Sequence, residues 1–318
     1  MKTLALAIAV ALLFTMSLLA GKVWLTPAQL VGGGPASIIL LELRLPRALL
    51  GALVGAALGL SGAALQGYLR NPLADPSVVG VAATAALGAV IAIFLGFAAS
   101  PALVFTSAMT GAALAVVLLI LIAGSSGSPV TFILAGSVLS SLAGALTAFL
   151  LSIAPDPFAA NEILGWLMGA LTDRGLDDVV RAAPPVLLGL ALLATTARAL
   201  DALTLGEEGA ASLGVDLARL RLVMVAGLCL TVGAAVAATG VVGFVGLVVP
   251  HLMRRAFGER PSALFLPSAL GGAALVLAAD SLVRLTPGAS EVQLGIATAL
   301  IGGPFFFTLL LKLRRTLP

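Results

Sequence analysis

The sequence predicts an all-α integral membrane protein of about ten transmembrane helices, with short half-helices among them. Of its 318 residues, 60% are hydrophobic and 10% are charged, and its mean hydropathy is +1.18. Several charge-free runs are long enough to cross a hydrocarbon layer, which takes about 20 apolar residues per helix. Glycine, serine and proline interrupt the longest runs and mark turns between spans. We expect one transmembrane domain over residues 1–318.

Composition excludes several classes of site. The lysines are Lys2, Lys22 and Lys312, and none follows a GxxxxG loop, so the chain has no Walker A site for ATP. The lone cysteine, Cys229, excludes an intrachain disulfide and a CxxC metal site. The lone histidine, His251, cannot form a histidine cluster. No segment interleaves basic and aromatic residues as nucleic-acid-binding proteins do. We therefore expect no catalytic residue, no metal site and no nucleic-acid partner.

The first two spans are delimited by basic residues. Thr3–Gly21 is a charge-free run of 19 residues. It also resembles a signal peptide, but its length and the lack of a clear A-x-A site favour a retained span. Ala48–Leu69 forms the second span, with Arg44 and Arg47 before it and Arg70 after it. Small residues recur along this span and favour close packing of helix backbones, namely Gly51, Gly55, Gly59, Gly62 and Ala63.

The middle of the chain predicts four more spans. Residues 76–155 carry no charge and fit three spans, with turns at Ala98–Pro101 and Gly124–Pro129. A polar window follows over Asp156–Arg181, and Ala182–Ala197 is the sixth span.

The C-terminal part contains a broken span. Leu222–Met253 is free of charge for 32 residues, too long for one span and too short for two full ones. Its glycines and Pro250 predict a full helix, a glycine-rich break and a half-length helix. Irregular backbone at this depth is tolerated only inside protein or beside a cavity. Spans at Ala263–Ala279 and Val292–Leu311 complete the ten.

The richest polar stretch, Arg198–Arg221, lies between the sixth and seventh spans, and we call it the platform. Glu207 and Glu208 suit the positive N-terminal end of a short helix. Gly214 would end that helix in a left-handed conformation, and Asp216 would cap the next helix. A plain solvated connector is the alternative interpretation.

The distribution of basic residues orients the chain. An even number of spans puts both termini on one side, and the cytoplasm is the side favoured by the positive-inside rule. This orientation places eleven basic residues inside and six outside. Those inside are Lys2, Arg70, Arg198, Arg219, Arg221, Arg254, Arg255, Arg260, Lys312, Arg314 and Arg315; those outside are Lys22, Arg44, Arg47, Arg174, Arg181 and Arg284.

Five motifs follow one another along the chain: RLPR (Arg44–Arg47), RNPLADP (Arg70–Pro76), LGEEGAASLGV (Leu205–Val215), GFVGLVVPH (Gly243–His251) and GIATALIGGPFF (Gly295–Phe306). In this order they resemble the FecCD-type permeases of ATP-binding cassette (ABC) importers, the vitamin B12, haem and iron–siderophore group. The likeness runs from about Ala28 to Arg315.

The resemblance implies a BtuC-like type II ABC importer permease in the lipid of a bacterial inner membrane, with both termini cytoplasmic. Two such ten-helix subunits would form a homodimer with two separate ATPase subunits, which would bind ATP and magnesium. A periplasmic substrate-binding protein would deliver the substrate. This chain itself would hold no cofactor.

The resemblance also assigns roles to residues. Within the platform, residues from about 205 to 221 are similar to the family's cytoplasmic coupling helices. The residues that would contact the ATPase are Glu207, Glu208, Ala211, Leu213, Gly214 and Arg219. Arg44, Arg47 and Arg284 match arginines on the periplasmic lip that receive acidic side chains of the binding protein. Bidentate hydrogen bonds to carboxylates suit arginine in this role. The alternatives are snorkelling at the interface, or for Arg284 an ion pair with Asp280.

A cytoplasmic gate is the last role that the resemblance implies. Asn71 and Leu73 match its first element, between spans two and three. Pro129 and Val130 match its second element, between spans four and five, where some relatives carry small hydroxyl residues and this chain does not.

These features predict the permease subunit of an importer for an iron chelate (ferric siderophore or haem) or cobalamin. An ion-coupled secondary transporter is the alternative. Such carriers place acids at mid-membrane, whereas Glu42, Asp280 and Glu291 all lie near predicted span ends. A membrane scaffold without transport would not need broken half-helices. Among the substrates, the family base rate favours a ferric siderophore.

Overall fold

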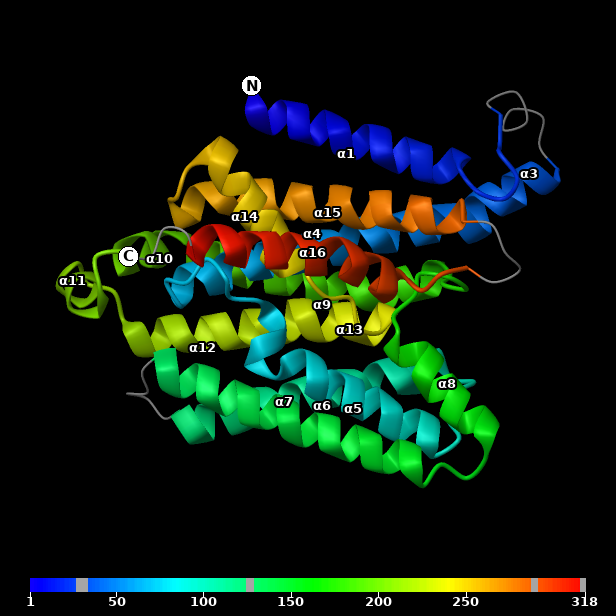
Figure 1. Ribbon diagram of the computed structural model, residues 1–318, viewed down its shortest axis with the longest axis horizontal. Coiled ribbons are helices and arrows are strands. Elements are labelled where there is room, and N and C mark those ends of the chain that lie inside the picture. Colours follow the sequence, from blue (N-terminus) through cyan, green and yellow to red (C-terminus); the bar gives the residue numbers. More distant parts are fainter. Residues whose placement is uncertain (27–33, 124–128, 287–290, 315–318) are drawn as a thin grey trace.

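The computed structural model describes residues 1–26, 34–123, 129–286 and 291–314, and no strand occurs within these ranges. Most of the helices run side by side along one axis (Figure 1). They are α1 (Lys2–Leu19), α3 (Pro35–Ile38), η1 (Ile39–Arg44), α4 (Leu45–Tyr68), η2 (Pro76–Val79), α5 (Val81–Phe94), α6 (Pro101–Ala123), α7 (Pro129–Ser152), α8 (Pro157–Leu167), α9 (Leu176–Thr195), α10 (Ala197–Leu203), α11 (Glu207–Ser212), α12 (Leu217–Leu228), η3 (Cys229–Gly233), α13 (Ala234–Thr239), α14 (Val245–Phe257), α15 (Pro261–Arg284) and α16 (Leu294–Arg314).

Each of the ten predicted spans contains a helix. Among the described residues, seven helical segments are long and apolar enough to cross a membrane, and α5 and the apolar part of α16 are shorter. The tenth segment is α14, a half-length helix of 13 residues. The predicted turn after α5 is confirmed, because α5 ends at Phe94 and α6 begins at Pro101. The fold is therefore that of an all-α multi-pass membrane protein.

The second and sixth spans begin earlier than the sequence predicts. A continuous helical segment runs from Pro35 to Tyr68 and includes a π-helical turn at Ile39–Arg44. Arg44 and Arg47 therefore lie within a helix and not at its exposed end. Helix α9 begins at Leu176, inside the predicted polar window, and the Asp178 carboxylate accepts a hydrogen bond of 2.9 Å from the Gly175 amide. Acidic residues stabilise the first turn of a helix, so this charged cluster starts a helix.

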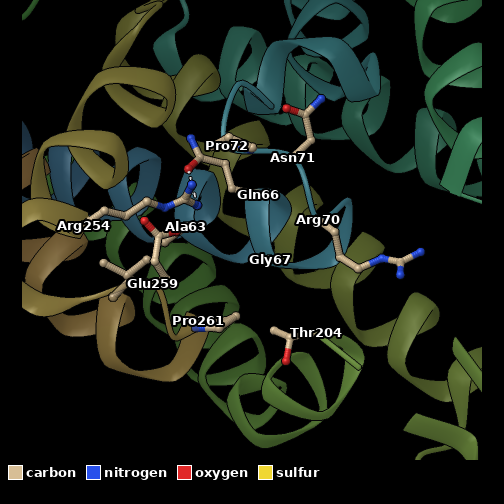
Figure 2. Close-up of a pocket in the computed structure, with 11 residues that line it drawn as sticks. Ala63, Gln66, Gly67, Arg70, Asn71, Pro72, Thr204, Arg254, Glu259 and Pro261 are labelled. Carbon is tan, nitrogen blue, oxygen red and sulfur yellow. Dashed lines mark hydrogen bonds between the residues drawn. The ribbon is translucent and has the colours of Figure 1, made fainter. Parts of the chain in front are cut away.

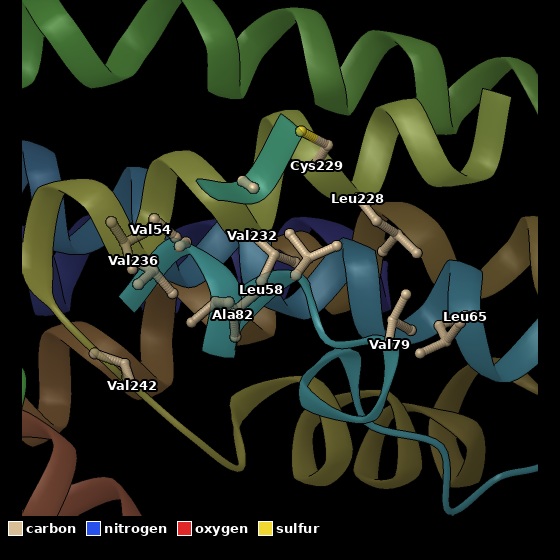
Figure 3. Packing of buried hydrophobic residues seen from close by; sticks show 14 of the residues in the cluster. Val54, Leu58, Leu65, Val79, Ala82, Leu228, Cys229, Val232, Val236 and Val242 are labelled. Atoms are coloured by element: carbon tan, nitrogen blue, oxygen red, sulfur yellow. The ribbon is translucent and has the colours of Figure 1, made fainter. Parts of the chain in front are cut away.

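Helix α4 lies at the centre of the bundle and contacts α15 and α14 through its glycines. A Cβ atom on Gly59 would lie 2.0 Å from the Ser268 carbonyl oxygen, and one on Gly62 would lie 2.0 Å from that of Gly246. The predicted close packing of backbones is therefore confirmed. On another side of α4, Val54 and Leu58 lie close to Val232 and Val236 in the apolar core (Figure 3).

The predicted break between α13 and α14 is also confirmed. Gly240 and Phe244 have positive φ angles of 73° and 67°. Neighbouring backbone satisfies part of this irregular segment, because the Ala170 amide donates to the Thr239 carbonyl at 2.7 Å. The start of α16 joins the same region, where the Gly295 amide donates to Met168 O at 3.2 Å. Backbone hydrogen bonds therefore link the end of α13 and the start of α16 to the segment after α8.

Different helix segments lie at the two ends of the bundle. Lys2 Nζ donates to Ala256 O at 2.7 Å, so the start of α1 lies beside the end of α14. The α10–α11 segment and the end of α16 lie toward this same end, whereas α3 and α8 lie toward the opposite end (Figure 1). We call these the platform end and the rim end.

Candidate functional site

The platform folds as the sequence predicts, into a short helix between two turns. Helix α11 begins at Glu207 after Gly206, whose φ angle is 95°. Glu207 and Glu208 occupy its first turn, and both are exposed. The Asp216 carboxylate accepts a hydrogen bond of 3.0 Å from the Arg219 amide and caps α12, while Arg219 itself is exposed. The acids therefore stand where the helix dipole stabilises them.

Gly214 closes α11 in a left-handed conformation, with a φ angle of +84°. The Val215 amide donates to Ala210 O at 3.0 Å and the Gly214 amide donates to Ala211 O at 2.9 Å. This pair of bonds is a Schellman motif, which needs a residue that tolerates positive φ. No atom lies within 4 Å of a Cβ built on Gly214, so the requirement for glycine here is conformational and not steric.

The outer face of the platform is apolar. Ala210 is fully buried, whereas Ala211 is exposed. Leu205 and Leu213 are 70% and 65% exposed. A cavity of about 550 Å³ beside these leucines is also lined by Glu259 and Arg260. Two leucines and a hollow outside the spans form a surface suited to another protein.

Asp201 of α10 attaches the platform to α15. Its carboxylate accepts hydrogen bonds from Arg260 Nε at 2.7 Å and from the Ser262 amide and hydroxyl at 2.9 and 2.7 Å. Burial alone would raise the pKa of Asp201, but the hydrogen bonds from Ser262 and Arg260 outweigh it and lower the pKa. Asp201 thus caps the N-terminus of α15 from a distant segment. The sequence gives no signal for it, because its partners lie about 60 residues away.

A second contact joins the platform to α4. Arg221 Nε of α12 donates to the Tyr68 hydroxyl at 3.1 Å. The Tyr68 ring meets Phe132 of α7 edge to face, with ring centroids 5.7 Å apart. A displacement of α12 would therefore be transmitted to the end of α4 and to the start of α7.

The predicted gate residues Asn71 and Leu73 lie in the loop after α4. Asn71 Oδ1 accepts a hydrogen bond of 2.9 Å from the Leu73 amide, and Asn71 is exposed. Pro129 begins α7. The side chains of Pro129 and Val130 lie outside the described part of the chain, so their gate role stays a prediction. So does that of Asn71 and Leu73.

Gln66 ties this loop to α14, a role that sequence reasoning missed. Its side chain is 1% exposed, and its Nε2 donates to Ala74 O and Gly246 O, both at 3.2 Å. Its Oε1 accepts a hydrogen bond of 2.9 Å from Arg254 Nη2 (Figure 2). These groups border a cavity of about 280 Å³ that is also lined by Arg70, Asn71, Thr204 and Glu259. The sequence shows only a lone glutamine in an apolar span shortly before the RNPLADP motif.

At the rim end the structure gathers five charged residues, which we call the rim cluster: Arg44, Arg47, Asp280, Arg284 and Glu291. The three arginines are only 8%, 9% and 4% exposed. Their side chains lie within the bundle and contact other groups of this chain. Arg44 is the last residue of the π-helical turn, and Arg47 lies in the helical segment that begins at Pro35. Their role in docking a binding protein stays a prediction.

Two of these arginines cap the end of α1. Arg44 Nη1 donates to Leu18 O and Leu19 O at 3.1 and 2.7 Å. Arg284 Nη1 donates to Ser17 O at 2.8 Å. The last carbonyls of a helix have no partner within it, and cations stabilise that end. Arg44 and Arg284 thus hold α1, which is otherwise largely exposed, against the bundle.

Arg47 joins both acids of the rim cluster. Its Nε and Nη2 donate to Asp280 Oδ1 at 2.9 and 2.8 Å, and Nη2 also donates to Glu291 Oε2 at 2.8 Å. Arg284 Nη2 lies 3.0 Å from Asp280 Oδ2, which is the ion pair named above as the alternative role of Arg284. A buried charge is tolerated when it is paired and hydrogen-bonded in this way.

Glu291 faces a cavity of about 580 Å³ that Lys22, Trp166, Thr172 and Arg174 also line. Burial alone would raise the pKa of Glu291, but the hydrogen bonds from Arg47 and Thr172 outweigh it and lower the pKa. Glu291 is therefore the carboxylate of the rim cluster that stays ionised beside open space.

Within the described ranges, no group of three or more His, Cys, Asp or Glu residues is placed to hold a metal ion. His251 of α14 instead packs edge to face on Phe305 of α16, with ring centroids 5.7 Å apart.

Comparisons with known proteins agree with this architecture. The profile of the FecCD transport family matches residues 8–312. The cobalamin import system permease protein BtuC of Halobacterium salinarum is 43% identical over 86% of this chain and 74% of its own length. The hemin transport system permease protein HmuU of Yersinia pestis is 39% identical over 87% of this chain and 84% of its own.

A solved structure described as a metal-chelate type ABC transporter in an inward-facing conformation is 33% identical, with a TM-score of 0.91. The similarity covers 98% of this chain and 99% of that chain. A family match over nearly the whole chain and a shared fold of the same extent lead to one conclusion: this chain belongs to the FecCD transport family and is a multi-pass membrane permease.

Proposed function

We propose that the chain is the translocating subunit of an ABC importer whose power stroke comes from a separate ATPase bound to the platform. The exposed face formed by Ala211, Leu205 and Leu213 carries this proposal, because it is apolar and lies outside the spans. A surface of this kind marks a protein contact. Glu207, Glu208 and Arg219 border it and would set the register of the contact through charge.

The contacts of the platform supply a route for the power stroke. Asp201 joins α10 to α15, and Arg221 joins α12 to the end of α4. From α4, Gln66 reaches the loop at Ala74 and the half-helix α14. A displacement of the platform would then move the proposed gate loop, which contains Asn71 and Leu73. Alternating access requires two packings of these elements, and two-state elements of this kind carry coupling between distant sites.

The functional unit we propose is a homodimer with two ATPase subunits and a periplasmic binding protein. One chain supplies one set of ten spans, and the translocation path would lie between two sets. The membrane would be the bacterial inner membrane, with the platform end cytoplasmic. The eleven basic residues assigned to that side support this orientation.

The substrate class is a metal chelate or cobalamin. Relatives include the cobalamin permease and the hemin permease, together with the Fe(3+) dicitrate permease protein FecD of Escherichia coli, which is 38% identical over 87% of this chain and 86% of its own. Among these we favour an iron chelate, with a ferric siderophore ahead of haem.

An ion-coupled secondary transporter remains the rival. Carriers of that class rely on acids at mid-membrane. Asp280 and Glu291 are instead engaged by Arg47 at the rim end, which supports the importer.

Copurification tests the ATPase contact. After mild detergent extraction, we expect an ATPase with a Walker A motif to copurify with the permease in equal amount. Leu213→Asp should abolish this copurification, because it places a charge on the apolar face. Val23→Asp is the matched control, since Val23 is 62% exposed at the rim end. Equal loss in both variants, or retention in both, would contradict the assignment of the platform.

A further inference from the structure

The two acids of the rim cluster are held very differently. Asp280 has a side chain 2% exposed and contacts both Arg47 and Arg284. Glu291 has a side chain 23% exposed and contacts one arginine, Arg47, through Nη2 at 2.8 Å. It also accepts a longer hydrogen bond of 3.2 Å from the Thr172 hydroxyl. Glu291 is thus the more weakly held and more accessible of the two carboxylates.

Glu291 separates Arg47 from open space. It lines the cavity of about 580 Å³ at the rim end, together with Glu162, Thr172 and Arg174, whereas Arg47 does not line it. The side chains of Arg47 and Asp280 are only 11% and 2% exposed. A carboxylate that enters the cavity could therefore reach Arg47 Nη2 if Glu291 moved aside.

The charges of the rim cluster favour a carboxylate beside Arg47 Nη2 at all times. Two guanidinium groups, those of Arg47 and Arg284, pair with two carboxylates, and this balance leaves one excess positive charge once Glu291 moves away. An unpaired charge in a poorly solvated place is strongly destabilising. Another carboxylate is the natural replacement, because the guanidinium fork matches its geometry.

We propose that Glu291 is an internal stand-in for a carboxylate of the periplasmic binding protein, which displaces it from Arg47 on docking. This inference rests on the proposed importer function and names the side chain that the docking partner must replace. Glu291, with a side chain 23% exposed, is the member of the rim cluster that lines the cavity at the rim end. A docking protein would meet that end first, so we assign the incoming group to a protein and not to the transported chelate. In the free permease Glu291 lowers the affinity for the partner and keeps Arg47 paired.

The affinity of the binding protein for the permease–ATPase complex tests this exchange. The probe is the binding protein of the same importer, on complex reconstituted in nanodiscs. Glu291→Gln should lower the dissociation constant about tenfold, because a neutral amide is a weaker competitor than a carboxylate for a guanidinium. Glu291→Asp should also lower it, since the shorter side chain retains the charge but reaches Arg47 poorly.

Glu162→Gln is the matched control, because Glu162 carries the same charge in the same cavity, whereas Glu291 is the carboxylate of that cavity that Arg47 contacts. If Glu162→Gln strengthens docking as much as Glu291→Gln does, or if Glu291→Asp behaves as wild type, the effect is general electrostatics and the proposal is wrong. Free citrate should not reproduce the competition at equal concentration; if it does, the site takes small carboxylates and not the protein.

A second measurement separates this inference from the proposed function. Modification of Arg47 by phenylglyoxal, followed by mass spectrometry, should be several-fold faster in Glu291→Gln than in wild type or Glu162→Gln. If the binding protein docks normally but Arg47 reactivity and affinity are unchanged in Glu291→Gln, the exchange is wrong and the importer stands. If no binding protein docks to any form while Arg47 reactivity rises, the shielding is real and the docking function fails.

Discussion

Gly214→Val tests whether the platform depends on the left-handed turn that ends α11. The φ angle of +84° at this position is unfavourable for any residue with a Cβ, at roughly 1–2 kcal/mol, and more so for a β-branched one. Relief of that strain would break the two Schellman hydrogen bonds, worth about 0.5–1.5 kcal/mol each. Helix α11 has only 6 residues and cannot absorb this loss by itself.

A change of about 2 kcal/mol corresponds to roughly a 30-fold smaller population of the closed helix. We therefore expect Gly214→Val to fray α11 and displace Ala211 and Leu213. Amide hydrogen exchange at Val215 should speed up by a similar factor. The ratio of ATP hydrolysed to substrate imported should rise, or the ATPase should cease to copurify.

Gly214→Asn is the matched control, since asparagine tolerates the left-handed conformation. Because nothing lies within 4 Å of a Cβ at this position, both substitutions meet open space and differ mainly in backbone preference. We expect Asn to keep most of the coupling. Normal transport by Gly214→Val, or equal damage by Asn and Val, would refute the conformational argument and make the platform a plain connector.

Three further changes test the contacts around the platform and α4. Asp201→Asn should loosen the attachment of α15. Because folding lowers the pKa of Asp201, the stabilisation by its carboxylate is complete above the unfolded pKa of about 3.9 and is lost as pH falls through the folded pKa. The difference in thermal stability between the variant and wild type should therefore shrink below about pH 4. A constant difference at all pH values would contradict the ion pair with Arg260. Gln66→Leu should leave Arg254 Nη2 and two carbonyls without a partner and lower the unfolding free energy by roughly 2–5 kcal/mol, measured by thermal unfolding in detergent. Gly62→Ala should prevent correct assembly, because its Cβ would lie 2.0 Å from a backbone oxygen, and a monodisperse, fully active variant would disprove this close approach.

The spans and the broken helix could be predicted from the sequence because they depend on local composition. Charge-free length sets a span, and the glycines at 240–246 are visible in one window. The left-handed Gly214 was predictable for the same reason, since helix capping is a matter of a few adjacent residues. Nothing about these features required knowledge of a distant partner.

The rim cluster could not be predicted in this way. Arg47 meets Asp280 across 233 positions of sequence and Glu291 across 244. Basic residues near a span end are expected at the interface, and only the tertiary arrangement shows that these face inward. The π-helical turn at Ile39–Arg44, of which Arg44 is the last residue, has no sequence signal that we recognise. Gln66 was missed because a single amide in an apolar span does not indicate its partners.

The exposed apolar surface of α1 follows from the membrane setting. Leu4 and Leu12 are each 66% exposed. In water such residues would favour aggregation, whereas lipid tails accommodate them without cost. The arginine caps at the end of α1 supply the polar attachment that such a peripheral helix needs.

The energy source of uptake tests the central claim most directly. Proteoliposomes would contain the permease and its ATPase, with the binding protein and a radiolabelled ferric siderophore, ferric citrate, haem or cobalamin outside. We predict accumulation of one of these substrates that requires ATP inside, the ATPase and the binding protein, and that persists when proton and sodium gradients are collapsed. Accumulation by the permease alone, driven by an ion gradient and indifferent to ATP, would contradict the account and identify a secondary transporter.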